Sequence, residues 1–168
     1  VNKTLKESEI VELFATVLDE GNPKSTYEWK SSDGQSKGSG LKYTFMVTKQ
    51  DNGKEFYCIA TNKIGTSESA KTTLTVQWPP TNLTISPGLI EGNEGTQITI
   101  IAQNTEANPA AQYQWILDGQ TLKTSSKEVP LKLIKSYNGK ILTCRAFNSA
   151  GEAPVVSVNI TVYWIGTL

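Results

Sequence analysis

The sequence contains no histidine, and it has only two cysteines and a single arginine, Arg145. Histidine is the commonest general base and the commonest metal ligand, so its absence argues against most catalytic and metal sites. Cys58 and Cys144 lie too far apart to form a CxxC-type zinc or redox motif. No glycine-rich phosphate loop or nucleophile elbow is present either. We therefore expect neither an enzyme nor a chain with a metal or cofactor.

The chain also has no excess of charge and no long apolar run. Sixteen Lys and Arg residues oppose sixteen Asp and Glu residues, which gives no electrostatic reason to bind nucleic acid or an anionic membrane. No apolar stretch approaches the roughly 20 residues that span a bilayer, and no signal peptide opens the chain. We expect a folded fragment without membrane contact of its own, cut from a longer secreted or membrane-anchored protein.

The sequence does contain an internal repeat. Trp29 and Trp115 are 86 positions apart (115 − 29), and Cys58 and Cys144 share that spacing (144 − 58). Each tryptophan follows an Asn-Pro pair. Each cysteine follows an Asn-Gly-Lys triplet and precedes an alanine, an asparagine and a glycine at matching offsets. Shared spacing over this length indicates two copies of one domain.

The boundary between the two copies is expected at Trp78-Pro79-Pro80. Two consecutive prolines end a strand, because they lack backbone donors, and they stiffen a short connection. The sequence therefore predicts one domain over residues 1–78 and a second over residues 79–168.

The apolar pattern within each copy is that of β-strands. Apolar residues recur at every second position over residues 11–17 in the first copy and over residues 98–102 in the second. Turn-forming clusters such as Ser32-Asp33-Gly34 separate these runs, and no helical period is sustained. Six or seven short strands per copy predict an all-β fold with one antiparallel sandwich in each half.

These motifs resemble the immunoglobulin superfamily over nearly the whole chain. The family has a buried tryptophan on strand C, which Trp29 and Trp115 match, and a cysteine on strand F, which Cys58 and Cys144 match. The short stretch between tryptophan and cysteine resembles I-set or C2-like domains and leaves little room for the C′ and C″ strands of variable domains. The resemblance implies two tandem immunoglobulin-like β-sandwiches from a cell-adhesion or cell-surface recognition receptor.

The chain departs from the family at the second half-cystine of each domain. Strand B carries Ala15 and Ala102 where the family has cysteine, so neither copy can form the usual intradomain disulfide. Closing a loop of about 40 residues is worth roughly 3–4 kcal/mol in the chain-entropy model, which packing must replace. We expect Cys58 and Cys144 to be buried, inert thiols. Whether the missing cysteines are natural or were replaced stays open.

Three Asn-x-Thr triplets begin at Asn2, Asn82 and Asn159. In a secreted chain such triplets accept N-linked glycans when the asparagine is exposed. Asn159 alternates with two apolar residues, so its side chain is expected to face solvent. We therefore predict glycosylation at these three positions, conditional on secretion.

Members of the family commonly bind partners through the outward face of strands C, F and G. Alternation along strand F places Tyr57 and Ile59 outward in the first copy, and Arg145 and Phe147 in the second. Ile116 of strand C is expected to form an exposed apolar pair with Phe147, typical of protein-binding patches. The alternative is that these residues merely favour strands and are covered by loops.

The resemblance implies an extracellular adhesion or recognition module that binds another cell-surface protein or a second copy of itself. One alternative is an intracellular muscle-type spacer, which the missing cysteines favour and the glycosylation triplets oppose. A second alternative is a carbohydrate-binding receptor, for which Arg145 is the sole arginine available.

Overall fold

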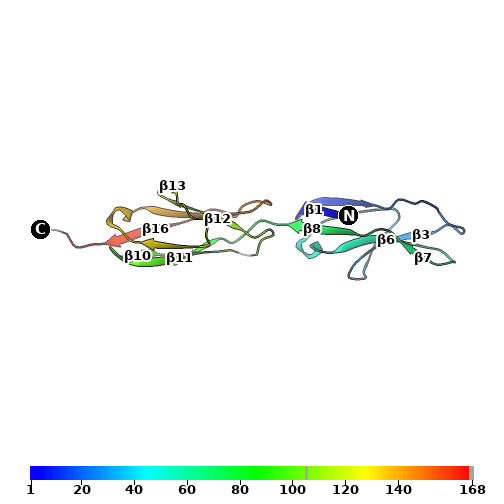
Figure 1. The fold of residues 1–168 in the computed structure, drawn as a ribbon, viewed down its shortest axis with the longest axis horizontal. Coiled ribbons are helices and arrows are strands. Elements are labelled where there is room, and N and C mark those ends of the chain that lie inside the picture. The colour runs from blue at the N-terminus through cyan, green and yellow to red at the C-terminus, as the bar shows by residue number, and fades with distance from the viewer. Residues whose placement is uncertain (105, 167–168) are drawn as a thin grey trace. The chain divides into compact units, whose positions relative to one another are not determined.

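The computed structural model describes residues 1–104 and 106–166, and its helical elements there are short 3-10 turns. Contacts divide the chain into two compact units, Val1–Gln77 and Trp78–Leu168, which are described separately. Trp78 falls in the second unit, where its backbone pairs with Asn108 through N–O distances of 2.8 and 3.1 Å. The expected all-β class with tandem immunoglobulin-like sandwiches is confirmed (Figure 1).

The first unit is built from two facing β-sheets. One sheet has the strand order β1-β8-β6-β3-β4, with β7 also paired to β6, and the other pairs β2 with β5. Strand β1 runs parallel to β8, and Figure 1 shows the two side by side. The elements are β1 (Asn2–Lys6), β2 (Ile10–Phe14), β3 (Thr26–Ser31), β4 (Ser36–Ser39), β5 (Lys42–Met46), η1 (Lys49–Asp51), β6 (Glu55–Thr61), β7 (Thr66–Glu68) and β8 (Thr72–Gln77).

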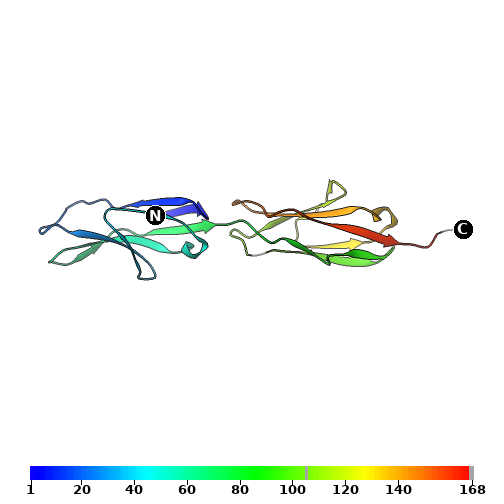
Figure 2. The same ribbon diagram turned by 180° about the vertical axis from the view of Figure 1, so that it is seen from behind.

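The second unit repeats this arrangement. One sheet has the order β10-β16-β15-β12-β13 and the other has the order β14-β11-β9. Strand β16, the red arrow in Figure 2, runs parallel to β10 and antiparallel to β15. The elements are β9 (Thr84–Ser86), β10 (Ile90–Asn93), β11 (Gln97–Gln103), β12 (Gln112–Leu117), β13 (Gln120–Thr121), β14 (Glu128–Lys132), η2 (Lys135–Tyr137), β15 (Ile141–Phe147) and β16 (Val156–Tyr163).

Strands β4 and β13 correct one expectation from the sequence. Each is a short C′ strand, paired with β3 in the first unit and with β12 in the second. Sequence length alone had left little room for such strands. They fit because each forms as a tight hairpin directly after its neighbour, through turns that contain Gly34 (φ +79°) and Gly119 (φ +81°).

The core of the second unit is centred on Trp115. Its side chain is fully buried and lies on β12 directly opposite Cys144 of β15. Burying an aromatic side chain of this kind removes roughly 150–250 Å² from water, worth at most about 4–6 kcal/mol. The indole Nε1 donates a hydrogen bond to the carbonyl of Ser126 at 2.9 Å, so the buried donor is satisfied.

The core of the first unit is more aromatic and less well satisfied. Trp29 is buried opposite Cys58, and Tyr43, Phe45 and Phe56 form an adjoining cluster with ring centroids 4.7–6.3 Å apart. The Nε1 of Trp29 is buried without a hydrogen-bond partner among the described residues. An unpaired buried donor costs about 1–3 kcal/mol. Trp29 therefore contributes less to the free energy of folding of its unit than a tryptophan with a satisfied indole N–H, such as Trp115, would.

Both cysteines are free and buried, and the expected absence of intradomain disulfides is confirmed. Ala102 lies fully buried in β11, whereas Ala15 lies just beyond β2 and is half-buried. Burial raises the pKa of the Cys144 thiol to about 11 and also raises that of Cys58. Neither thiol is poised as a nucleophile at neutral pH, because the thiolate is the reactive form.

Candidate functional site

The candidate site is the outward surface of β12, β15 and β16 in the second unit, here called the Arg145 face. Leu142, Cys144 and Ala146 of β15 point into the core, so the alternate residues of the same strand point outward. Arg145 is thereby brought opposite Gln114 of β12 in the antiparallel register. Strand pairing places both side chains on one rigid surface.

Arg145 is held on this face by two polar contacts. Its Nη1 donates to Gln114 Oε1 at 3.1 Å, and its Nη2 forms an ion pair with Glu152 Oε2 at 2.6 Å. Both side chains of the ion pair are partly exposed, at 39% and 49%, so the pair adds little to the free energy of folding. Its effect is to fix the direction of the guanidinium.

Arg145 and its neighbours line an open hollow of about 560 Å³. The lining combines a cation, an anion, two primary amides and an aromatic ring, and consists of Gln114, Arg145, Phe147, Asn148, Gly151 and Glu152. Protein-binding surfaces often combine an aromatic anchor and arginine with a polar rim. The hollow therefore has the composition of a protein contact surface.

One wall of the hollow is held by Asn148. Its Nδ2 donates to the carbonyls of Trp78 at 2.8 Å and Pro109 at 2.7 Å. Its Oδ1 accepts from the backbone N–H groups of Ala150 and Gly151 at 2.8 and 3.2 Å. The turn that carries Glu152 is thus fixed by side-chain contacts, which reduces the entropy lost on binding.

The expected apolar pair of Ile116 and Phe147 is wrong in its geometry. Ile116 lies opposite Thr143, and Phe147 lies opposite Gln112. The row formed by Gln114 and Arg145 separates them, although both are half-buried on the same face. The register between β12 and β15 decides this, since residues at the far ends of paired strands do not touch. Among the six residues that line the hollow, Phe147 is the one with an apolar side chain, and Ile116 does not line it.

The matching face of the first unit differs in chemistry. Tyr57 and Ile59 of β6 point outward and are half-buried, with Ile59 at the position that Arg145 occupies in the second unit (145 − 86). Lys71 lies over the Tyr57 ring, its Nζ 5.2 Å from the centroid, and pairs with Glu55 at 3.5 Å. This face therefore has an isoleucine in place of the guanidinium that lines the hollow in the second unit.

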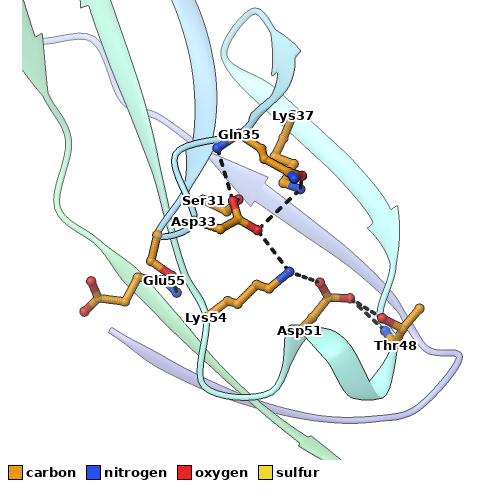
Figure 3. Close-up of polar contacts among 9 residues, drawn as sticks. Ser31, Asp33, Gln35, Lys37, Thr48, Asp51, Lys54 and Glu55 are labelled. Carbon is orange, nitrogen blue, oxygen red and sulfur yellow. Dashed lines mark hydrogen bonds and ion pairs between the residues drawn. The ribbon is translucent and has the colours of Figure 1, made fainter.

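A polar network in the first unit ties two turns together (Figure 3). Lys54 Nζ pairs with Asp33 at 3.2 Å and with Asp51 at 3.7 Å, while Asp51 accepts from the Thr48 backbone and hydroxyl at 2.9 and 2.8 Å. The pKa of Asp33 is held well below its ordinary value, chiefly by hydrogen bonds from the Ser31 hydroxyl and the Gln35 N–H. The network links the β3–β4 turn to η1.

The second unit carries a reduced version of the same network. Lys140, 86 positions after Lys54, pairs with Asp118 at 2.7 Å, and Tyr137 replaces Asp51. Asn138 accepts from the Val162 N–H at 3.0 Å, so the Asn-Gly-Lys triplet anchors the turn to β16. These contacts give the repeated triplet a structural role.

In residues 1–104 and 106–166, no group of three or more His, Cys, Asp or Glu residues could hold a metal ion.

The asparagines of all three Asn-x-Thr triplets are exposed. Asn2 lies in β1, Asn82 precedes β9 with a left-handed backbone (φ +51°), and Asn159 lies in the middle of β16. Glycosylation at these positions is a proposal that requires secretion, and exposure meets its steric requirement.

Sequence reasoning missed an apolar surface on the opposite sheet of the first unit. Ile10, Phe14 and Met46 point outward from β2 and β5 with exposures of 66%, 65% and 59%. Ile10 and Met46 are direct register partners, while Lys42 lies over the Phe14 ring, its Nζ 5.4 Å from the centroid. The alternation along β2 carried this signal, because the inward positions of Val11 and Leu13 place the alternate residues of the strand, Ile10 and Phe14 among them, outward.

The fold and register define the class of this chain as a tandem immunoglobulin-like β-sandwich. No family model matches the sequence. Mouse B-cell receptor CD22 is 26% identical over 151 residues, covering 86% of this chain, and rat nephrin is 29% identical over 126 residues, covering 67%. The chain spans 17% and 10% of the lengths of these relatives.

Among the described residues, no helix is long and apolar enough to cross a bilayer.

Solved structures give the same result at the level of the fold. The N-terminal four Ig domains of Dscam1 isoform 6.9 match with a TM-score of 0.68 and 18% identity, covering 96% of this chain and 43% of that one. Dpr2 Ig1-Ig2, solved in complex with DIP-Theta Ig1-Ig3, gives a TM-score of 0.55 and 20% identity, covering 96% and 61%. The expected resemblance to immunoglobulin-like domains is therefore confirmed at the level of the fold.

Proposed function

We propose that this chain is the extracellular part of a recognition receptor and binds another cell-surface protein through the Arg145 face. The observation that carries the proposal is the open hollow in which Arg145, Glu152 and Phe147 lie together. A fixed ion pair beside a half-buried aromatic ring offers charge complementarity and apolar contact to a protein partner. The similarity to CD22, a B-cell receptor, supports placement at the cell surface.

The two alternatives have less support from the residues. A muscle-type spacer needs no lined hollow, although the unbridged Cys58 and Cys144 suit a reducing compartment. A receptor for acidic carbohydrate needs a free guanidinium, whereas Arg145 is occupied by Glu152 and Gln114. A protein partner can instead contact both signs of the ion pair.

Binding can be tested with the chain itself as the probe. A biotinylated chain, tetramerised on streptavidin, is applied to cells that each display one cell-surface ectodomain. We expect binding to at least one displayed protein and a loss of at least tenfold in affinity for Arg145→Ala and Phe147→Ser. Met46→Lys, on the other sheet of the first unit, is the matched surface control. Equal loss with Met46→Lys, or no effect of the two face variants, would contradict the proposal.

Self-recognition is the form of this proposal in which the partner is a second copy. Sedimentation velocity over a concentration series up to high micromolar distinguishes it from binding to a different protein. Concentration-dependent dimers that Arg145→Ala abolishes support the homophilic form. A strictly monomeric species removes that form and leaves binding to a different protein to be decided by the cell assay.

A further inference from the structure

The Arg145 face also carries the triplet Asn159-Ile160-Thr161. Val158 and Ile160 are 9% and 1% exposed and point into the core, so Asn159 between them points out from β16. Its register partner on β15 is Ile141, which lies on the same surface as Arg145 and Phe147. The triplet is therefore on the sheet face proposed to bind a partner.

We propose that an N-glycan on Asn159 covers the Ile141 end of the Arg145 face and confines partner binding to the end formed by Arg145 and Phe147. This inference rests on the proposed function, because glycosylation requires secretion. Phe147 lies six positions from Ile141 along β15 (147 − 141), about 20 Å away at about 3.3 Å per residue. The row formed by Thr143 and Ser157, whose hydroxyls are 2.8 Å apart, lies between the two ends.

Comparison of the two units supports a cover over Ile141. Ile141 is an apolar residue left 47% exposed next to Asn159. In the first unit the matching pair is Glu55 and Thr73, where a charged residue stands in place of isoleucine and no acceptor triplet is present. The exposed isoleucine thus occurs in the unit that has an acceptor beside it. A bulky, solubilising glycan is suited to cover such a residue.

Occupancy is tested by expressing the chain behind a secretory leader in animal cells and mapping glycopeptides by mass spectrometry. We expect a glycan on Asn159, and loss of one glycan mass in Asn159→Gln. Asn82→Gln is the matched control: Asn82 precedes β9, which belongs to the other sheet, so this variant should leave the Asn159 glycopeptide unchanged. If the chain is secreted but its Asn159 peptide carries no glycan, the inference is overturned. The binding proposal is tested separately, by the Arg145 and Phe147 variants.

Coverage is tested by cysteine accessibility. Ile141→Cys and Phe147→Cys are each labelled with a maleimide polymer in the glycosylated chain and in the Asn159→Gln background, where the buried Cys58 and Cys144 stay unlabelled. We expect the glycan to slow labelling at position 141 several-fold and to leave position 147 unchanged. Equal rates at position 141 with and without the glycan, or equal slowing at both positions, overturn the inference.

Discussion

The side-chain amide of Asn148 donates a hydrogen bond to the carbonyl of Pro109 at 2.7 Å, joining the turn after β15 to the segment before β12. The first unit repeats the contact, with Asn62 donating to Pro23 at 2.8 Å. The Asn-Pro pairs and the later asparagines, which appear in the sequence as separate repeated motifs, are therefore partners in one structural contact. The proline and the asparagine recur together in both units because each supplies one partner of this hydrogen bond.

Removing this contact should destabilise the second unit more than the first. Asn148 bonds to two carbonyls and two N–H groups, whereas Asn62 bonds to one carbonyl and two N–H groups. We expect Asn148→Ala to cost about 2–3 kcal/mol and Asn62→Ala about 1–2 kcal/mol. Urea unfolding, with hydrogen exchange to assign each transition to a unit, measures both. Equal losses would show that the extra bond to Trp78 contributes nothing.

The two core tryptophans should respond differently to the same substitution. Trp115→Phe removes the hydrogen bond to Ser126 and leaves a void, whereas Trp29→Phe leaves a void but also removes an unpaired buried N–H. We expect Trp115→Phe to destabilise its unit by about 1–2 kcal/mol more than Trp29→Phe destabilises the first. Chemical denaturation of the two variants gives the comparison. A larger loss for Trp29→Phe would contradict the assigned hydrogen bonding.

Folding stability should fall between about pH 9 and pH 11, in part because of Cys144. Its pKa is about 11 in the folded chain, raised by burial, against an ordinary value of 9.0. As pH rises through this window the unfolded state loses the thiol proton first, so the unfolded state is favoured and folding stability declines. Cys144→Ala should flatten this part of the stability curve, measured by denaturation at each pH. An unchanged slope would mean that other groups account for all of the decline.

A cysteine at position 102 should restore the missing disulfide of the second unit. Ala102 of β11 and Cys144 of β15 are both fully buried, in the two facing sheets. Under oxidising conditions we expect Ala102→Cys to bridge to Cys144 and to stabilise the unit by roughly 3–4 kcal/mol. Thr99→Cys, at an exposed position of the same strand, is the control that should leave Cys144 free. Intact mass and thiol titration detect the bridge, and a free thiol pair in Ala102→Cys would show that strand B is misassigned.

Much of the fold follows from local features of the sequence. The 86-residue repeat, the period of two and the turn clusters predict the sandwiches, because side-chain alternation and turn chemistry depend on neighbouring residues. The inward positions of Trp115 and Cys144 follow from the same alternation. The sequence predicts part of the candidate site. Alternation along strand F places Arg145 and Phe147 outward, but no sequence pattern indicates that Glu152 lines the same hollow.

The sequence by itself determined which side chains alternate into each core and that two copies of one β domain are present. Tertiary structure alone decided that Arg145 meets Glu152, that Ile116 is separated from Phe147, and that Trp29 lacks the hydrogen bond that Trp115 makes. The physical reason is that these outcomes depend on the register between strands and on the path of the connecting turns. Both are set by packing between segments distant in the chain, which a local pattern does not encode.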